Sequence, residues 1–191
     1  MDCVSYLNRI LEKLLPTHDI VRDYPAGGQV VPAYARYEAM NEKYVLSRKA
    51  TLWKAGEYEH VLFFTVPAKT AAGSPSGDAE QAAVSPVTPD TATDLAQQLI
   101  TGYMEPVLSR NNEKYPPKDH MRTFLTAVII SEVSLSEALI RRIRKYRFDK
   151  GYQFSFRGFS QGRLVFVDLG AGKVFTSPAA NDVAEFYGRI L

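Results

Sequence analysis

The chain has 191 residues, of which 46% are hydrophobic and 23% charged, and its formal net charge is +2. A domain of this length buries enough apolar surface to fold without disulfides or metal ions, and its small charge excludes binding to nucleic acid or acidic membranes through overall charge alone. The single cysteine, Cys3, excludes an intramolecular disulfide and a cysteine-rich zinc site.

The N-terminal part predicts a helix followed by three strands. Apolar residues recur at helical spacing over residues 2–15, and Pro16 ends this helix. The strands that follow are joined by predicted turns at Asn41 and Glu42 and at residues 54–56. The three strands are expected over residues 34–40, 44–53 and 58–66.

Residues 68–93 differ in composition from the rest of the chain. They contain no aromatic residue, and their only large aliphatic residues are Val84 and Val87. Such a stretch cannot bury enough surface to offset its ordering entropy. We therefore expect a single domain over residues 1–191 with a flexible, low-complexity insertion at about 68–93, of which a plain linker is favoured over a regulatory loop.

The middle of the chain predicts a helix, a central strand and a second helix. Helical periodicity returns at Asp90, and Pro106 is expected to end or kink the helix. Residues 122–131 form the most apolar, β-branched run, which is typical of a strand buried on both faces at the centre of a sheet. Ser134 and Glu137 then have the spacing of a capping box at the start of the next helix.

The C-terminal part predicts three short strands and a last helix. In the first strand, Tyr152, Phe154 and Phe156 are expected to point inward because aromatic and polar residues alternate. The three strands are expected over residues 152–157, 163–169 and 173–176. A turn over residues 170–172 joins the last two strands, and the helix is expected over residues 179–190. The order of elements predicts an α+β fold, with a mixed, mainly antiparallel sheet flanked by about four helices.

A group of cations on the helix after the central strand is the first candidate site. Such residues hold phosphate groups in nucleic-acid-binding proteins. The candidate anion or nucleic-acid site consists of Arg141, Arg142, Arg144, Lys145 and Arg157. The alternative is a solvated helix face near the negative end of the helix dipole, and the near balance of 23 basic and 21 acidic residues favours it.

Two acidic residues on a predicted strand are the candidate metal site. Alternate positions place Glu57 and Glu59 on one face, where two carboxylates can hold a divalent cation. The succession of elements resembles the core of the restriction-endonuclease-like nucleases, a family that places an acid on one strand and Glu-x-Lys on the next. Val61 stands where that motif requires lysine, which puts a nuclease site in doubt. No cofactor is expected.

Two stretches of the chain carry a resemblance to a known family. Residues 120–126 and 165–175 are similar to an uncharacterised bacterial domain family without an assigned activity, over roughly the last third of the chain. The resemblance implies no catalytic residues, so these stay unknown and the sequence leaves open whether the protein is an enzyme.

The location and partners follow from what the sequence lacks. Residues 1–9 do not have the basic and apolar segments of a signal peptide, and no run approaches the ~18 apolar residues of a membrane span. We expect a small, non-catalytic cytoplasmic domain that binds another protein, or its own copy as a homodimer, and no membrane. The alternative is a nucleic-acid-binding or restriction-endonuclease-like module that uses the basic helix face.

Overall fold

The computed structural model describes residues 1–45, 47–68 and 87–191, and it describes side chains outside residues 41–55. Most of the insertion expected at residues 68–93 therefore lies outside the described residues. Its last residues are helical, because a helix begins at Pro89, where Thr88 caps the free amide of Thr91. None of the described helices combines the length and apolar character needed to cross a bilayer.

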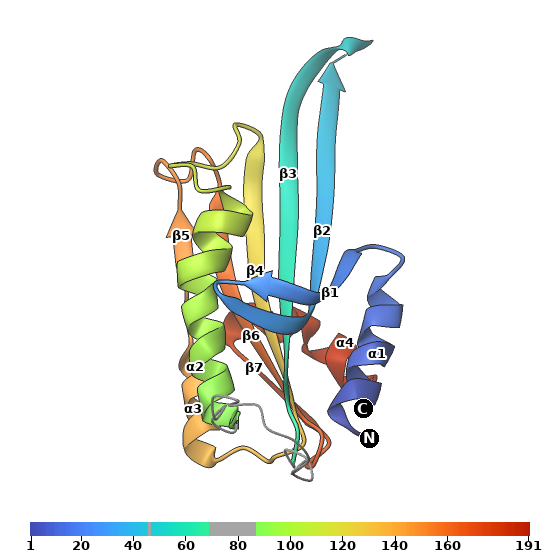
Figure 1. Ribbon diagram of the computed structural model, residues 1–191. Helices are drawn as coiled ribbons and strands as arrows, with labels where there is room; N and C mark the ends of the chain where they lie inside the picture. The colour runs from blue at the N-terminus through green and yellow to red at the C-terminus, as the bar shows by residue number, and fades with distance from the viewer. Residues whose placement is uncertain (46, 69–86) are drawn as a thin grey trace, which may run out of the picture.

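A mixed sheet forms the centre of the fold, with strand order β1-β2-β3-β4-β6-β5 and with β7 paired to β6 (Figure 1). The strands are β1 (Asp19–Ala26), β2 (Gln29–Val45), β3 (Ser47–Val66), β4 (His120–Ser131), β5 (Asp149–Gly151), β6 (Phe159–Asp168) and β7 (Lys173–Thr176). Strand β4 runs parallel to β3 and β6, whereas the other pairs are antiparallel. The predicted fold class is confirmed.

Helices cover both faces of this sheet. The described helices are α1 (Cys3–Leu14), α2 (Pro89–Leu99), the π-helix η1 (Ile100–Ser109), α3 (Glu137–Lys145), the 3₁₀-helix η2 (Pro178–Val183) and α4 (Ala184–Gly188). One core lies between the sheet and α2, η1 and α3, and the other lies between the sheet and α1 and α4. Because successive strand residues point to opposite faces, Ile129 enters the first core and Ile130 the second.

The prediction of a buried central strand is confirmed. Strand β4 pairs on both sides, and the side chains of residues 127–130 are fully buried. The predicted start of the next helix is wrong by two residues, because Ser136 rather than Ser134 caps it: the Ser136 hydroxyl accepts from the Leu139 amide at 3.2 Å. Both serines precede a helical stretch, so spacing alone does not distinguish them.

The strands of the first half are longer than predicted. Strand β1 lies between the first predicted helix and the first predicted strand, and Gly27 and Gly28, with φ of 56° and 84°, make the turn into β2. The predicted turns are wrong, since Asn41 and Glu42 lie within β2 and pair with residues 55 and 54 of β3. The resulting hairpin extends well beyond the first residue of β4, His120 (Figure 1).

The predicted strand at residues 152–157 is also wrong. The chain forms a tight turn there, in which Gln153, Phe154 and Ser155 adopt φ of 48°, 54° and 67°, and Phe154 and Phe156 are 100% and 88% exposed. The alternation of aromatic and polar residues does not produce a strand here, because β5 ends at Gly151 and the chain then reverses direction into β6. Gly158 closes the turn with φ of 71°, and a Cβ there would lie 2.1 Å from a backbone oxygen of β4.

The predicted C-terminal turn is confirmed, and the predicted C-terminal helix is found in two pieces. Residues 170–172 form the predicted turn between β6 and β7, whose strands pair from Asp168 and Lys173. The last helix is divided into η2 and α4 rather than continuous.

Candidate functional site

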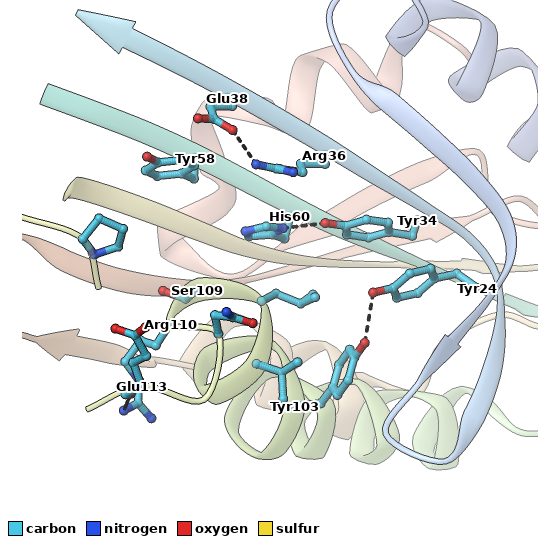
Figure 2. A pocket seen from close by; sticks show the side chains of 14 residues that line it. Tyr24, Tyr34, Arg36, Glu38, Tyr58, His60, Tyr103, Ser109, Arg110 and Glu113 are labelled. Atoms are coloured by element: carbon cyan, nitrogen blue, oxygen red, sulfur yellow. Dashed lines mark hydrogen bonds and ion pairs between the residues drawn. The ribbon is translucent and has the colours of Figure 1, made fainter. Parts of the chain in front are cut away.

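A cavity of about 550 Å³ opens on the face of the sheet that η1 partly covers. Its walls come from β1, β2 and β3 on one side and from η1 and the following loop on the other (Figure 2). We call it the tyrosine pocket, after the aromatic residues that line it. These are Tyr24, Tyr34, Tyr58, His60 and Tyr103.

The register of β2 and β3 explains which side chains share the pocket. Arg36 lies opposite His60, and Glu38 lies opposite Tyr58. Directly opposed residues of an antiparallel pair point to the same face, so these four side chains form one surface. Tyr24 joins them from the neighbouring strand β1, where its ring stacks on that of Tyr34.

The helical wall departs from ordinary α-helix geometry. Helix α2 continues into η1, and Pro106 lies inside η1. Proline cannot continue α-helical hydrogen bonding, and the chain takes the wider π-helical turn, a feature often found at functional sites. This segment carries Tyr103 and Ser109 into the pocket, and Arg110 follows directly after it. The helix therefore does not end at Pro106: it changes type at Ile100, and the π-helical stretch runs through Pro106 to Ser109.

His60 is the most enclosed polar group of the pocket. Only 5% of the residue is exposed, and its Nδ1 lies 2.7 Å from the Tyr34 hydroxyl. Burial, reinforced by the positive charge of Arg36, lowers the pKa of His60 to about 4. The imidazole is therefore neutral at neutral pH.

The tyrosines form a connected group. The Tyr24 and Tyr34 rings stack at 4.3 Å between centroids, and the Tyr24 and Tyr103 hydroxyls lie 2.9 Å apart. The Tyr103 hydroxyl donates to the Pro25 carbonyl oxygen at 3.3 Å, so it accepts from Tyr24. Burial raises the pKa of Tyr34 to about 12 and that of Tyr24 further, so both phenols are neutral.

Ion pairs occupy the charged groups near the pocket. Arg36 pairs with Glu38 at the mouth. Arg110 donates to Glu105 at 2.9 Å, and this carboxylate, 3% exposed, also lies 3.0 Å from both Lys150 Nζ and the Tyr152 hydroxyl. Burial by itself raises the pKa of Glu105, but these hydrogen bonds outweigh it and the pKa lies below the ordinary value. Glu105 thus anchors η1 to the β5–β6 region.

The predicted metal residues lie on the opposite face of β3 and are engaged with cations. Glu57 pairs with Arg122 at 2.9 Å. Glu59 accepts from Thr126 at 2.9 Å and lies 3.7 Å from Arg163. Among the residues that the structure describes, no three His, Cys, Asp or Glu side chains come close enough to share a metal ion. This geometry favours ion pairing at the two carboxylates.

The five predicted basic residues are not brought together. Arg141, Arg144 and Lys145 are exposed on α3, and Arg144 also lies over the Phe175 ring. Arg142 pairs with Asp94 at 2.9 Å. Arg157 lies in the turn before β6, beside the start of β4, whereas α3 follows the end of β4. Arg157 therefore lies apart from the four basic residues of α3, near the opposite end of β4.

The sequence contained part of the signal for the pocket. The alternation over residues 34–40 places Tyr34, Arg36 and Glu38 on one side, and parity separates His60 from Glu57 and Glu59. The missed parts are strand β1 and the position of η1 over the sheet, although most of η1 was predicted to be helical. Their approach to β2 and β3 is a tertiary contact that no local pattern indicates.

The chain was compared with known proteins. No curated protein and no solved structure matches it. One family, described as a domain of unknown function (DUF8052), matches residues 2–73 and 80–189. The match extends far beyond the last third expected from the sequence, and it is interrupted inside the low-complexity stretch. The expectation of an uncharacterised family is confirmed, and the chain belongs to the DUF8052 family.

Proposed function

We propose that the protein is a non-catalytic binding domain that holds a small organic ligand in the tyrosine pocket. The observation that carries this proposal is a cavity walled by four tyrosines and His60, in which hydrogen bonds already fix the hydroxyls of Tyr24, Tyr34 and Tyr103 and one nitrogen of His60. Small-molecule sites are typically largely preformed, with aromatic walls and a few placed polar groups. The tyrosine pocket has this character.

Binding is favoured over catalysis by the protonation states in the pocket. General acid–base catalysis works best when the pKa of the group lies near the operating pH. His60, with a pKa of about 4, and Tyr34, with a pKa of about 12, lie on either side of that range. Both groups therefore keep their protons fixed near neutral pH, which suits recognition.

The test is an NMR screen of the full chain against a library of small aromatic and aliphatic fragments. Binding fragments are expected to shift the ring signals of His60 and Tyr34. A Val107→Trp variant fills the cavity and is expected to abolish these shifts. The matched control is Val4→Trp, because Val4 is 65% exposed on α1, across the sheet. Fragments that fail to bind, or that bind the Val107→Trp variant equally well, would contradict the proposal.

A second candidate function is self-association through the turn after β5. Phe154 and Phe156 are almost fully exposed there, and aromatic side chains are enriched at protein interfaces. Backbone hydrogen bonds from Arg157 to Tyr152 and from Tyr152 to Gly158 hold the turn. This arrangement supports the expected homodimer. Sedimentation should show a dimer that a Phe154→Ser/Phe156→Ser variant dissociates, and a wild-type monomer at high concentration would end this candidate.

The nucleic-acid alternative has less support. Arg142 is paired with acidic residues, and Arg157 donates to the Pro116 carbonyl oxygen at 3.0 Å. Binding to DNA or RNA at low salt that disappears when Arg141, Arg144 and Lys145 are reversed to glutamate would restore it. A cytoplasmic location also stays a prediction, supported by the single cysteine, which suits a reducing compartment.

A further inference from the structure

We infer that the ligand of the tyrosine pocket is an uncharged molecule with a planar body that presents an acceptor oxygen, such as an amide carbonyl, to Nε2 of His60. This inference rests on the proposed function and specifies the class of ligand. It follows from the tautomer of His60, from the surroundings of its free nitrogen and from the charges around the cavity.

The hydrogen bond to Tyr34 determines the tautomer. The Tyr34 hydroxyl and His60 Nδ1 are 2.7 Å apart, so one of them donates to the other. A phenol gives up its proton more readily than a neutral imidazole N–H, and an imidazole nitrogen accepts better than a phenol oxygen. The Tyr34 O–H therefore donates to Nδ1. The proton of the neutral imidazole then resides on Nε2.

The Nε2–H of His60 faces the cavity. Figure 2 shows one ring nitrogen bonded to Tyr34 and the other directed away from it, and His60 is among the lining residues. Nε2 has no hydrogen-bond partner among the described residues, although the residue is only 5% exposed. Nε2 is not one of the buried side-chain atoms that lack a partner, so solvent reaches it from the cavity. A ligand that supplies an acceptor oxygen can replace water at this donor.

His120 provides an internal comparison. It is also buried beside the pocket, where its ring stacks on Tyr58, but both of its nitrogens are occupied. Nδ1 lies 2.7 Å from the Arg157 carbonyl oxygen, to which it must donate, and Nε2 lies 2.8 Å from the Thr123 hydroxyl. The two histidines should therefore hold opposite tautomers, and His60 alone of this pair keeps a donor free for a ligand.

The charges around the cavity favour an uncharged ligand. Both lining arginines are compensated, Arg36 by Glu38 and Arg110 by Glu105. The remaining charged lining residue, Glu113, is exposed at the rim. An ion placed beside His60 would lose its hydration without a free counter-charge, which is costly. A neutral carbonyl or amide meets the free N–H without this cost.

The arrangement of the rings supports a planar body. Tyr24 and Tyr34 stack at 4.3 Å, and the Tyr34 and His60 rings lie nearly parallel at 6.0 Å between centroids. Flat walls of this kind match a flat aromatic or conjugated ligand, since aromatic pairs prefer offset stacking or edge contacts.

The first experiment measures the tautomers in the ligand-free, full-length protein. Long-range ¹H–¹⁵N NMR spectra should show a protonated Nε2 and a bare Nδ1 for His60, and the reverse for His120. A His60 ring protonated on Nδ1 would overturn the inference before any ligand is added. Because this measurement uses the wild-type chain, it does not depend on whether a variant folds.

The second experiment titrates three probes of similar shape, namely benzamide, benzoate and benzylamine. Benzamide should bind about tenfold more tightly than the two charged probes, in line with one gained hydrogen bond. His60→Phe should lose about the same factor for benzamide, whereas His60→Gln, which keeps an N–H donor, should retain most of the affinity.

The outcomes separate the two proposals. If none of the probes and none of the library fragments binds, the proposed function fails. If the charged probes bind as well as benzamide, or if His60→Phe binds benzamide normally, the pocket binds ligands but the inference about their class is wrong.

Discussion

The two faces of β3 differ in whether their polar side chains have all their partners within the protein. On one face, Glu57 and Glu59 are matched by Arg122, Arg163 and Thr126, so that each charge has a partner. On the other face, His60 has one nitrogen bonded to Tyr34 and the other facing the tyrosine pocket. In the sequence, the two nearby carboxylates suggest a metal site, but in the structure they form ion pairs and hydrogen bonds with neighbouring strands. The face that carries Tyr58 and His60 retains a free donor and the cavity.

Removing Arg163 should have the largest effect on stability, because this arginine pairs with acidic residues on the face of β3 that carries Glu57 and Glu59. We call this face the closed face. Arg163 is 5% exposed, lies 3.0 Å from Asp182 and 3.7 Å from Glu59, and covers the Phe124 ring at 3.4 Å. Arg163→Met leaves the partly buried Glu59 carboxylate without its arginine, with His18 at 3.9 Å as the remaining basic neighbour, and should lower the free energy of unfolding by about 4 kcal/mol.

Urea denaturation of the Arg163→Met variant tests this expectation. The control is Arg141→Met, because Arg141 is exposed on α3, and it should change stability by no more than ~0.5 kcal/mol. If the two variants are equally stable, the ion pairs of the closed face contribute little, and the contrast between the two faces is lost.

Glu105→Gln should have the next largest effect and acts on the pocket face. The glutamine side chain would keep the shape but leave Arg110 and Lys150 without their negative partner, at a cost of about 3 kcal/mol. Because Arg110 lines the pocket, the variant should also weaken ligand binding. Thermal unfolding measures the first effect. The nearby exposed Glu113→Gln is the control, and equal unfolding temperatures would contradict the anchoring role of Glu105.

His60 should give the pocket face a pH dependence. Its pKa in the folded protein, about 4, lies below the ordinary 6.5. Between these two pH values His60 is therefore protonated in the unfolded chain and neutral in the folded chain. The stability from neutral His60 is complete above pH 6.5 and is lost as the pH falls towards 4. Between pH 7 and pH 5, this single group should lower the free energy of unfolding by about 2 kcal/mol.

Comparison of wild type with His60→Gln isolates this contribution, because glutamine does not titrate. The wild type should lose more stability between pH 7 and pH 5 than the variant does. Parallel pH curves would show that His60 is hydrated or already charged in the folded state. Its role as a fixed neutral donor would then be untenable.

Much of the scaffold could be predicted because local patterns determine it. The β-branched run at residues 122–131 predicts the central strand, since such residues suit a strand buried on both faces. The pair Gly170 and Gly172 predicts the β6–β7 turn. These elements depend on residues close in sequence, which a pattern can detect.

The pocket and the exposed turn depend on contacts between distant segments. Tyr24 and Tyr103 meet only because η1 lies over β1, 79 residues away in the chain. Phe154 and Phe156 alternate like strand residues, but the chain turns at residues 153–155, and Gly158 then lies close against β4. Parity along β3 separates His60 from its acidic neighbours, yet it does not indicate which face carries a cavity.

Tyr24→Phe should have the smallest effect and tests how far the tyrosine group is preorganised. The change removes the hydrogen bond that joins β1 to η1, where the two hydroxyls lie 2.9 Å apart, while the ring stack on Tyr34 remains. One hydrogen bond of this kind contributes about 1 kcal/mol to the free energy of unfolding. Tyr37→Phe is the control, since Tyr37 lies on the other face of β2, beside His18. If Tyr24→Phe is neutral in urea denaturation and leaves benzamide affinity unchanged, β1 is a passive wall, and the pocket face is organised by β2, β3 and η1 alone.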